Sequence, residues 1–531
     1  MNEGAPGSAR PDGGGPPQTD PGLSSAGLVG RNSVLNVGTS ALLVLLGLVF
    51  IPLMIRSFGM ELYGVLTITW MVLGQLGWLN VGLGRASTRF VARDIARRQP
   101  SRAGVWVWTA TGVQVTVGAA GAAALWLLAP TLVDLLRVSP ENHELTVFAL
   151  RTFGLVIPLE LAASSLRGVL EATQRFGTIN ALGAFEAVWT YSVYGLGIYL
   201  GGDLRAVVLG LVFYKVVVVG LLAYFGGRYL PSLLSGRTLR TVRRRYRAKL
   251  RELLGYGGWV AASQGAGPLL MMWDRWVISA LLGAAVLPLY TVPMSLLQRL
   301  GFLPAGLTST LFPAFTDLHT RADWGRIEDF YIRSHKYLMI LFVPVLFVGF
   351  VWGGGALAVW VGPSFAAEAT APLQIITVGY VVALLAPVSG SLLDGAGRPD
   401  VMPKIYAVEV PVNLVAVYVL TSQFGVVGAA WSFTIRALFE TLAVWVMVYR
   451  VLPLSKSRIV RECVTPIGLA AVVLAVGAGV IIVGKVSLLG AALASLLLIV
   501  SYAAYTLSVV IDQRDIDFFA NFIQNRRGAS A

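Results

Sequence analysis

Apolar residues form long blocks along this chain, and short connections rich in arginine separate these blocks. Most blocks are about as long as a helix that crosses the hydrocarbon core of a bilayer, which takes roughly 20 residues. The pattern therefore predicts an all-α integral membrane protein with about 14 transmembrane helices. The expected helices span 33–55, 63–84, 104–128, 145–166, 177–200, 206–227, 255–282, 286–312, 337–361, 369–393, 402–421, 426–449, 464–484 and 487–510.

The composition supports a membrane protein and excludes several other classes. Hydrophobic residues make up 56% of the chain and charged residues 13%, whereas a soluble domain needs a more charged surface. The net charge of +14 does not indicate nucleic acid, because the cations lie between the apolar blocks, where they act as topology signals. A single cysteine, Cys463, and three scattered histidines give no intramolecular disulfide and no metal-ligand spacing. Neither a metal nor another cofactor is expected.

The distribution of basic residues tests the helix assignment, because Lys and Arg are retained on the cytoplasmic side. With both termini cytoplasmic, 32 of the 41 Lys and Arg fall in inner segments, and the outer segments hold only Arg56, Arg137, Arg205 and Lys485. Residues 1–30 are rich in Gly, Pro and Ser and lack the apolar core of a signal peptide. We expect a disordered cytoplasmic tail there, and a second cytoplasmic tail at 511–531.

A sequence repeat divides the chain. QLGWLNVGL at 75–83 recurs as RLGFLPAGL at 299–307, and the same offset carries Gly59 onto Gly283. Six crossings lie between the copies, so both run in the same direction through the membrane. Transporters built from parallel repeats bind their substrates near the midplane, between the two halves.

The repeat predicts two parallel six-helix lobes with additions at their ends. The expected divisions are an N-terminal lobe at 31–227, a linker at 228–254, a C-terminal lobe at 255–450 and two further helices at 451–510. The linker contains RTLRTVRRRYRAKLRELL, whose apolar residues follow helical spacing among many arginines. It should lie flat against anionic membrane lipids as a topology anchor, and a regulatory switch is the alternative.

Charged residues inside the predicted helices are candidates for function, because each costs roughly 2.5–3.5 kcal/mol at mid-bilayer. Arg436 and Glu440 are four residues apart on one helical face and are expected to pair with each other. The last two helices have no charge in their interiors, which favours a peripheral, lipid-facing position. The full set is Arg151, Glu160, Glu186, Lys215, Asp274, Arg275, Arg299, Glu409, Arg436 and Glu440.

Arg299 has two explanations that the sequence leaves open. It lies ~20 Å along its helix from the outer end, and it replaces Gln75 of the first repeat. It could present a cation to a cavity between the lobes, opposite the amide of Gln75, because the ligand is anionic and asymmetric. It could instead form a structural salt bridge with Asp274 or Glu409.

The hypothesis of an anionic ligand also makes other polar and basic residues candidates for binding. At the predicted cytoplasmic mouth, arginines recur every four residues and form a basic stripe, which could capture phosphate or simply anchor the topology; it consists of Arg85, Arg89, Arg93 and Arg97. The candidate substrate-binding residues are Arg299, Arg275, Lys215, Arg85, Arg89 and Gln75.

Two stretches resemble a known family. RNSVLNVGTSALLVLLGLVFIPLMIRSFGMELYGVLTITWMVLGQLGWLNVGLGRASTRFVAR at 31–93 is similar to the start of bacterial polysaccharide exporters and oligosaccharide flippases. It has the family's proline near the end of the first helix, Pro52, its Gly-x-x-x-Tyr-Gly turn at 59–64 and its Gly-Leu-Gly element at 82–84. MMWDRWVISALLGAAVLPLY at 271–290 resembles the family's Asp-Arg on helix 7, although Pro288 stands where glycine is usual.

The resemblance covers roughly 31–460 and implies membership of the multidrug/oligosaccharidyl-lipid/polysaccharide exporter superfamily. It implies a non-enzymatic transporter of the bacterial cytoplasmic membrane that flips a polyprenyl-diphosphate-linked oligosaccharide by alternating access, for surface polysaccharide or exopolysaccharide biosynthesis. A polysaccharide polymerase and export machinery are further candidate partners. The resemblance also implies coupling to a proton or sodium gradient, for which Asp274, Glu160 and Glu186 are the candidates.

Two alternatives remain. A multidrug or cation antiporter of the same superfamily would favour an acidic cavity, and the intramembrane charges are too balanced to decide. A membrane-embedded polysaccharide polymerase would need a catalytic cluster near one membrane face, which the short outer connections do not readily supply.

Overall fold

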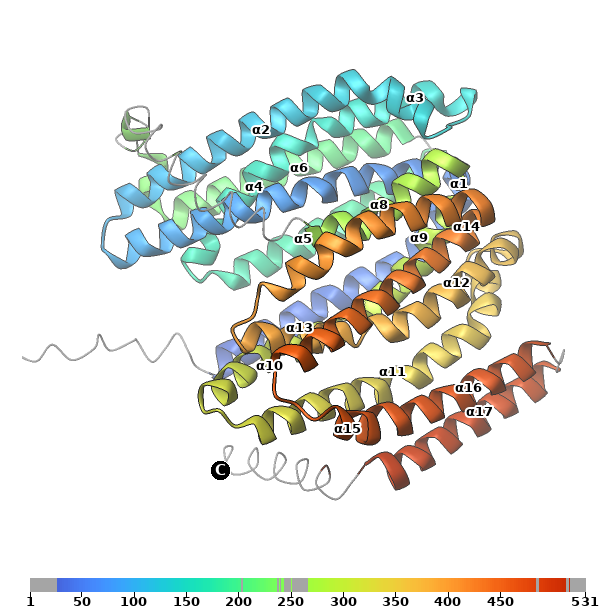
Figure 1. The fold of residues 1–531 in the computed structure, drawn as a ribbon. Coiled ribbons are helices and arrows are strands. Elements are labelled where there is room, and N and C mark those ends of the chain that lie inside the picture. The colour runs from blue at the N-terminus through green and yellow to red at the C-terminus, as the bar shows by residue number, and fades with distance from the viewer. Residues whose placement is uncertain are drawn as a thin grey trace, which may run out of the picture.

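The computed structural model describes residues 26–201, 204–235, 238, 240–242, 250, 266–483, 487–511 and 515, and these residues form helices and their connections (Figure 1). The first half contains α1 (Ala26–Ala96), α2 (Pro100–Leu135), α3 (Pro140–Gly154), α4 (Val156–Ala172), α5 (Phe176–Tyr199), α6 (Leu204–Tyr229) and the short η1 (Pro231–Leu234). The second half contains α8 (Ala266–Leu282), α9 (Pro288–Gln298), η2 (Arg299–Gly301), α10 (Phe302–Thr320), α11 (Trp324–Trp360), α12 (Pro363–Ala383), α13 (Ala386–Gly395) and α14 (Val401–Val451). The C-terminal part contains α15 (Lys456–Ile459), η3 (Val460–Val464), α16 (Thr465–Val483), α17 (Leu488–Tyr505) and η4 (Thr506–Val510).

The predicted all-α membrane fold is confirmed, with some changes at the boundaries. The predicted helices at 33–55 and 63–84 form one helical run, α1, with a kink at Gly59, and those at 402–421 and 426–449 form α14 with a kink at Gly425. Eight stretches of the described chain are long and apolar enough to cross a membrane. They are Leu45–Trp70, Pro100–Leu135, Pro140–Ala172, Leu204–Tyr229, Trp324–Trp360, Pro363–Gly395, Val401–Val451 and Leu488–Val510.

Some predicted segments lie outside the described residues. These are 1–25 of the N-terminal tail, 255–265 of the seventh predicted helix, and most of both the basic linker and the C-terminal tail. The structure also leaves the side chains of Gln75 and Arg85 undescribed, although both residues belong to the helical run of α1.

The backbone conformation of the turns between helices repeats in the two halves, as the sequence does. Every described residue with a positive φ has a counterpart in the other half, at the offset of the sequence repeat or one position from it. The pairs are Gly59 and Gly283, Arg98 and Ala322, Arg137 and Gly362, Gln174 and Gly397, and Gly201 and Gly425. Glycine takes this left-handed conformation without steric cost, which explains its frequency in the set. Five successive connections of the first half therefore recur in the second.

The hydrophobic cores follow the same division. Among the described residues, one buried cluster around Trp106 and another around Phe153 are built from α1 to η1, which we call the N-lobe. A third, around Tyr290 and Phe315, is built mainly from α8 to α14, the C-lobe, and from the C-terminal helices. Figure 1 shows the two groups of helices side by side, with α1 and α8 near their boundary.

The lobes are joined directly at the end that we expect to face outward. The backbone N–H of Ala284 donates to the carbonyl of Leu136 across 3.1 Å, and the guanidinium of Arg137 donates to the carbonyl of Leu281 across 2.7 Å. A side chain at Gly64 would collide with the carbonyl of Ala284, so only glycine permits this approach. Arg137, an exception to the positive-inside pattern, therefore binds a carbonyl at the C-terminal end of α8.

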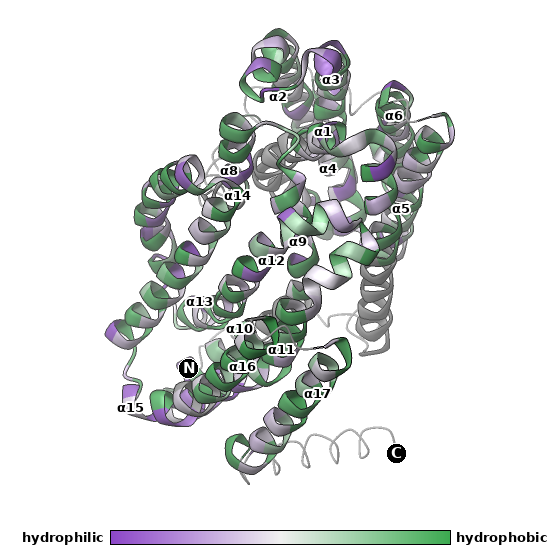
Figure 2. Ribbon diagram, turned by 90° about the vertical axis from the view of Figure 1, so that its right-hand side faces the viewer, coloured by the Kyte–Doolittle hydropathy of each residue, from purple (hydrophilic) through white to green (hydrophobic). Residues whose placement is uncertain are grey.

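The C-terminal helices pack on the outer side of the C-lobe, against α11. Figure 1 shows α16 and α17 along one edge of the helices, and Figure 2 shows that their residues are mostly hydrophobic. Large apolar side chains on them are exposed, among them Leu469, Val476, Leu488 and Leu497. In a bilayer these side chains would contact lipid.

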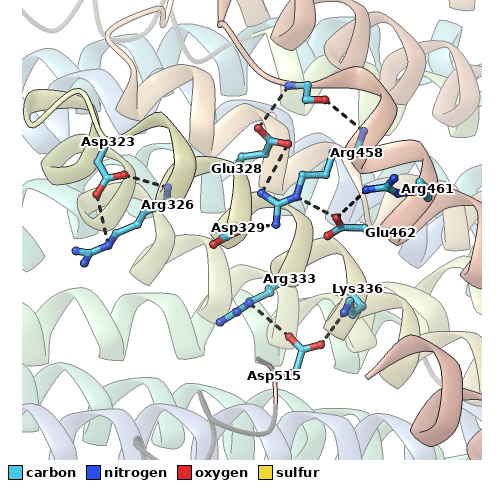
Figure 3. Close-up of polar contacts among 11 residues, drawn as sticks. Asp323, Arg326, Glu328, Asp329, Arg333, Lys336, Arg458, Arg461, Glu462 and Asp515 are labelled. Carbon is cyan, nitrogen blue, oxygen red and sulfur yellow. Dashed lines mark hydrogen bonds and ion pairs between the residues drawn. The ribbon is translucent and has the colours of Figure 1, made fainter. Parts of the chain in front are cut away.

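A cluster of charges fastens this C-terminal part to the start of α11 (Figure 3). The carboxylate of Asp515, 1% exposed, accepts from Lys336 at 2.6 Å and from the hydroxyl of Tyr337 at 2.8 Å. Arg458 contacts Asp329 at 2.5 Å and Glu462 at 3.0 Å. These pairs join α11 to both ends of the segment that contains α16 and α17. They therefore fix these two helices to the C-lobe.

We predict that Asp515→Ala destabilises this attachment. It leaves the ammonium group of Lys336 buried without its carboxylate, which costs about 3–5 kcal/mol in comparable buried pairs. The apparent melting temperature of the purified protein should fall clearly. Asp317→Ala, which removes an exposed pair with Arg321, is the control and should change it little. Equal melting temperatures for wild type and Asp515→Ala would show that the ion cluster does not hold the C-terminal helices.

Candidate functional site

A cavity of about 840 Å³ lies between the two lobes. Helices α1, α4 and α5 form the N-lobe side of the cavity, and α8, α9 and η2 form the C-lobe side. Figure 1 labels α1, α4, α5, α8 and α9. The lining residues with polar or aromatic side chains are Tyr63, Thr67, Trp70, Arg167, Asn180, Glu186, Thr190, Tyr191, Tyr194, Arg275, Ser295 and Arg299. A cavity of this size matches the range of known small-molecule sites, about 300–1,000 Å³.

Arg275 and Arg299 both line this cavity from the C-lobe. The Nε of Arg275 is buried and has no hydrogen-bond partner among the described residues, which leaves a donor available to a bound molecule. The guanidinium of Arg299 lies against Gly47 of α1, where a side chain would occupy the same space. Arg299 therefore reaches across the boundary between the lobes.

Lys215 is buried in an ion cluster inside the N-lobe. Its ammonium group lies 2.5 Å from a carboxylate oxygen of Glu160 and 2.6 Å from one of Glu186. Arg167 lies 3.7 Å from the other oxygen of Glu186. Glu186 and Arg167 also line the cavity, whereas Lys215 and Glu160 are not among its lining residues. Two cations thus balance two carboxylates in this cluster.

The C-lobe contains a related ion cluster, in which carboxylates outnumber cations. Arg436 donates to Glu409 at 3.1 Å and to Glu440 at 3.3 Å, which confirms the predicted Arg436–Glu440 pair and adds a third member. Asp274 lies nearby, 3% exposed, and accepts from the hydroxyl of Tyr290 at 2.8 Å. The Oε2 atom of Glu409 is buried and has no hydrogen-bond partner among the described residues.

The two clusters occupy corresponding places in the duplicated fold. Glu186 on α5 and Glu409 on the first half of α14 are separated by nearly the same offset as the two copies of the repeat. Each binds a cation on the helix that follows, Lys215 on α6 or Arg436 in the second half of α14. The two carboxylates considered as partners of Arg299 already have other contacts, because Glu409 binds Arg436 and Asp274 binds Tyr290. A salt bridge from Arg299 to either carboxylate would compete with that contact.

Two described arginines of the basic stripe, Arg89 and Arg93, do not line the cavity. Arg93 contacts Asp94 at 3.3 Å and lies over the ring of Phe90, and Arg89 is exposed. Arg151 also lies elsewhere, over the ring of Trp126.

Sequence reasoning missed the aromatic residues of the cavity. Tyr63 and Trp70 come from α1, and Tyr191 and Tyr194 come from α5. In the sequence these residues are ordinary members of apolar helices, and nothing distinguishes them from aromatic residues that face lipid. Their spacing of seven and of three residues places each pair near one helical face, but only the packing of α1 against α5 shows which face meets the cavity.

The charge of the cavity lining indicates whether an anionic or a cationic ligand fits better. Three arginines and one carboxylate line the cavity among the described residues, and that carboxylate, Glu186, is bound by Lys215 and Arg167. The excess carboxylates, Asp274, Glu409 and Glu440, are not among the lining residues. The cavity therefore suits an anion better than a cation.

Comparisons with known proteins agree with this architecture. Residues 37–188 match the MatE family model. A protein of Shigella flexneri named as a candidate O-antigen transporter is 25% identical over 418 residues, which cover 78% of this chain and 96% of that protein.

Two solved structures share the fold. An inward-facing multidrug resistance MATE family transporter of the MOP superfamily aligns with a TM-score of 0.66 at 13% identity, over 78% of this chain and 97% of that one. The lipid II flippase MurJ in an inward closed conformation aligns with a TM-score of 0.66 at 10% identity, over 91% of this chain and 100% of that one. The MatE match and the shared fold agree with the superfamily that the sequence resembles. The chain matches the MatE model over residues 37–188, and it is a multi-pass membrane protein that shares its fold with these two transporters.

Proposed function

We propose that this transporter flips a polyprenyl-diphosphate-linked oligosaccharide from the inner to the outer leaflet of a bacterial cytoplasmic membrane, with both termini cytoplasmic. The observation that carries the proposal is the excess of arginine on the cavity wall, with Arg275 and Arg299 on one side. The similarity to the Shigella candidate O-antigen transporter and the fold shared with the lipid II flippase support it.

The proposed mechanism assigns the diphosphate to the C-lobe wall. Guanidinium groups bind phosphate oxygens through paired, charge-assisted hydrogen bonds, and they keep their charge in an apolar environment. Arg275 and Arg299 would hold the diphosphate in the cavity while the prenyl chain stays in the bilayer. Opening of the lobes at the outer end would require the Leu136–Ala284 and Arg137–Leu281 hydrogen bonds to break.

A multidrug or cation antiporter remains the alternative, because the MATE transporter fold is also shared. A cationic drug would have to enter a cavity whose lining carries three arginines and one neutralised carboxylate. Electrostatic repulsion disfavours this ligand class.

Coupling to an ion gradient is part of the proposal, with Asp274, Glu160 and Glu186 as the candidate residues. Glu160 and Glu186 are balanced by Lys215 and Arg167, so they can stay ionised without a bound ion. Asp274, Glu409 and Glu440 are three carboxylates near Arg436, and Arg275 also acts on Asp274 electrostatically, which leaves one carboxylate in excess. Such an excess of buried negative charge favours binding of a proton or a metal cation, which makes Asp274 the strongest of the three.

We predict that Arg299→Gln lowers flipping of a fluorescent polyprenyl-diphosphate disaccharide in proteoliposomes at least about tenfold, because a charge-assisted contact worth roughly 1.5–3 kcal/mol is lost. Arg299→Lys keeps the charge without the paired geometry and should retain part of the activity. Arg151→Gln, which removes an intramembrane arginine away from the cavity, is the matched control and should stay near wild type. Near-normal activity in both Arg299 variants would end the substrate-binding assignment.

We also predict that Asp274→Asn abolishes the stimulation of flipping by an imposed proton or sodium gradient while flipping without a gradient persists. The amide keeps the hydrogen bond from Tyr290 but cannot bind a proton at neutral pH. Flipping is measured in proteoliposomes with and without each gradient. If Asp274→Asn responds to the gradients as wild type does, coupling through this residue is refuted.

A further inference from the structure

The two walls of the cavity differ in chemistry. The C-lobe contributes two arginines and Ser295, and its lining residues include no aromatic side chain among those described. The N-lobe contributes every aromatic side chain of the described lining, namely Tyr63, Trp70, Tyr191 and Tyr194, which we call the aromatic wall. A ligand in this cavity therefore meets Arg275 and Arg299 on one side, and aromatic rings together with the Arg167–Glu186 pair on the other.

The aromatic wall is held in place by contacts behind it. The indole N–H of Trp70 donates to the hydroxyl of Tyr194 across 2.6 Å, and the Trp70 ring packs edge-on against Phe153. The ring of Tyr191 packs edge-on against Tyr194, with the ring centroids 6.0 Å apart, and it also contacts the ring of Phe50. These rings are fixed before any ligand arrives, so binding to them costs little conformational entropy.

Polar groups also line the N-lobe side of the cavity. Thr67 and Thr190 lie within about one helical turn of wall residues, and Asn180 lies about 16 Å along α5 from Tyr191. The side-chain amide nitrogen of Asn180 is buried and has no hydrogen-bond partner among the described residues. A purely apolar ligand, such as a prenyl chain, would leave that donor unsatisfied, whereas a ligand rich in hydroxyl groups would bond to it.

Sugar rings combine the two properties that this wall requires. One face of a pyranose presents C–H groups that pack against an aromatic face, and the ring edge carries hydroxyl groups that need hydrogen-bond partners. We propose that the aromatic wall is the subsite for uncharged sugars next to the diphosphate, while Arg275 and Arg299 on the C-lobe wall hold the diphosphate itself. This assignment rests on the proposed function, and it divides one substrate between the two lobes.

The test compares two probes that differ only in their sugars. The full chain in phosphatidylcholine nanodiscs is titrated with farnesyl diphosphate and with farnesyl diphosphate that carries two neutral hexoses, because glycoside detergents would compete for the wall. Wild type should bind the glycosylated probe about tenfold more tightly, as expected for stacking worth about 0.5–1.5 kcal/mol per contact. In Tyr63→Leu/Tyr191→Leu this preference should disappear, while the Kd of the bare probe stays within about twofold.

Two controls separate loss of stacking from loss of structure. Tyr191→Phe keeps the aromatic face and should keep the preference. Tyr199→Leu removes a tyrosine of the same helix that is 86% exposed and not part of the lining, and it should behave as wild type.

The outcomes distinguish this inference from the proposed function. No preference in wild type, or equal weakening of both probes in Tyr63→Leu/Tyr191→Leu, would overturn the sugar subsite. Arg275→Gln should weaken both probes by the same factor and leave the preference intact. If it weakens neither while the double tyrosine variant still loses the preference, the diphosphate assignment fails and the sugar subsite stands.

Discussion

The structure depends on one constraint, which is that a charge buried among apolar helices must be neutralised or must face water. Lys215 and Arg436 meet it in the same way, each by binding a glutamate from the preceding helix within its own lobe. Arg275 and Arg299 line the cavity between the lobes. The cost of desolvation thus explains why Lys215 and Arg436 are paired within their lobes and why Arg275 and Arg299 lie on the cavity wall.

The duplicated fold explains why this separation produces an asymmetric site. The five paired turns with positive φ show that both halves fold alike, from Gly59 and Gly283 to Gly201 and Gly425. The side chains at the boundary have diverged, with the aromatic wall on the N-lobe and the two arginines on the C-lobe. Rocking of one lobe against the other would move two chemically different surfaces relative to a ligand held by both. The outer hydrogen bonds of Leu136 and Arg137 hold the lobes together at one end.

The sequence predicted those features that depend on local pattern. Apolar blocks located the helices, the constant offset between matching stretches revealed the repeat, and four-residue spacing predicted the Arg436–Glu440 pair, which the structure confirms. It did not indicate that Lys215 binds Glu160 and Glu186, because those residues lie on three helices whose facing sides are set by packing. The aromatic wall was missed for the same reason, since an aromatic residue in an apolar helix can face lipid, core or cavity with the same local pattern.

The most direct test of this account is a cryo-EM structure of the full chain in nanodiscs with a polyprenyl-diphosphate oligosaccharide bound. The account predicts density for the diphosphate within hydrogen-bond distance of Arg275 and Arg299, and for the first sugars against Tyr63 and Tyr191. Density for the diphosphate at the basic stripe near Arg89 and Arg93, with the cavity between the lobes unoccupied, would contradict it.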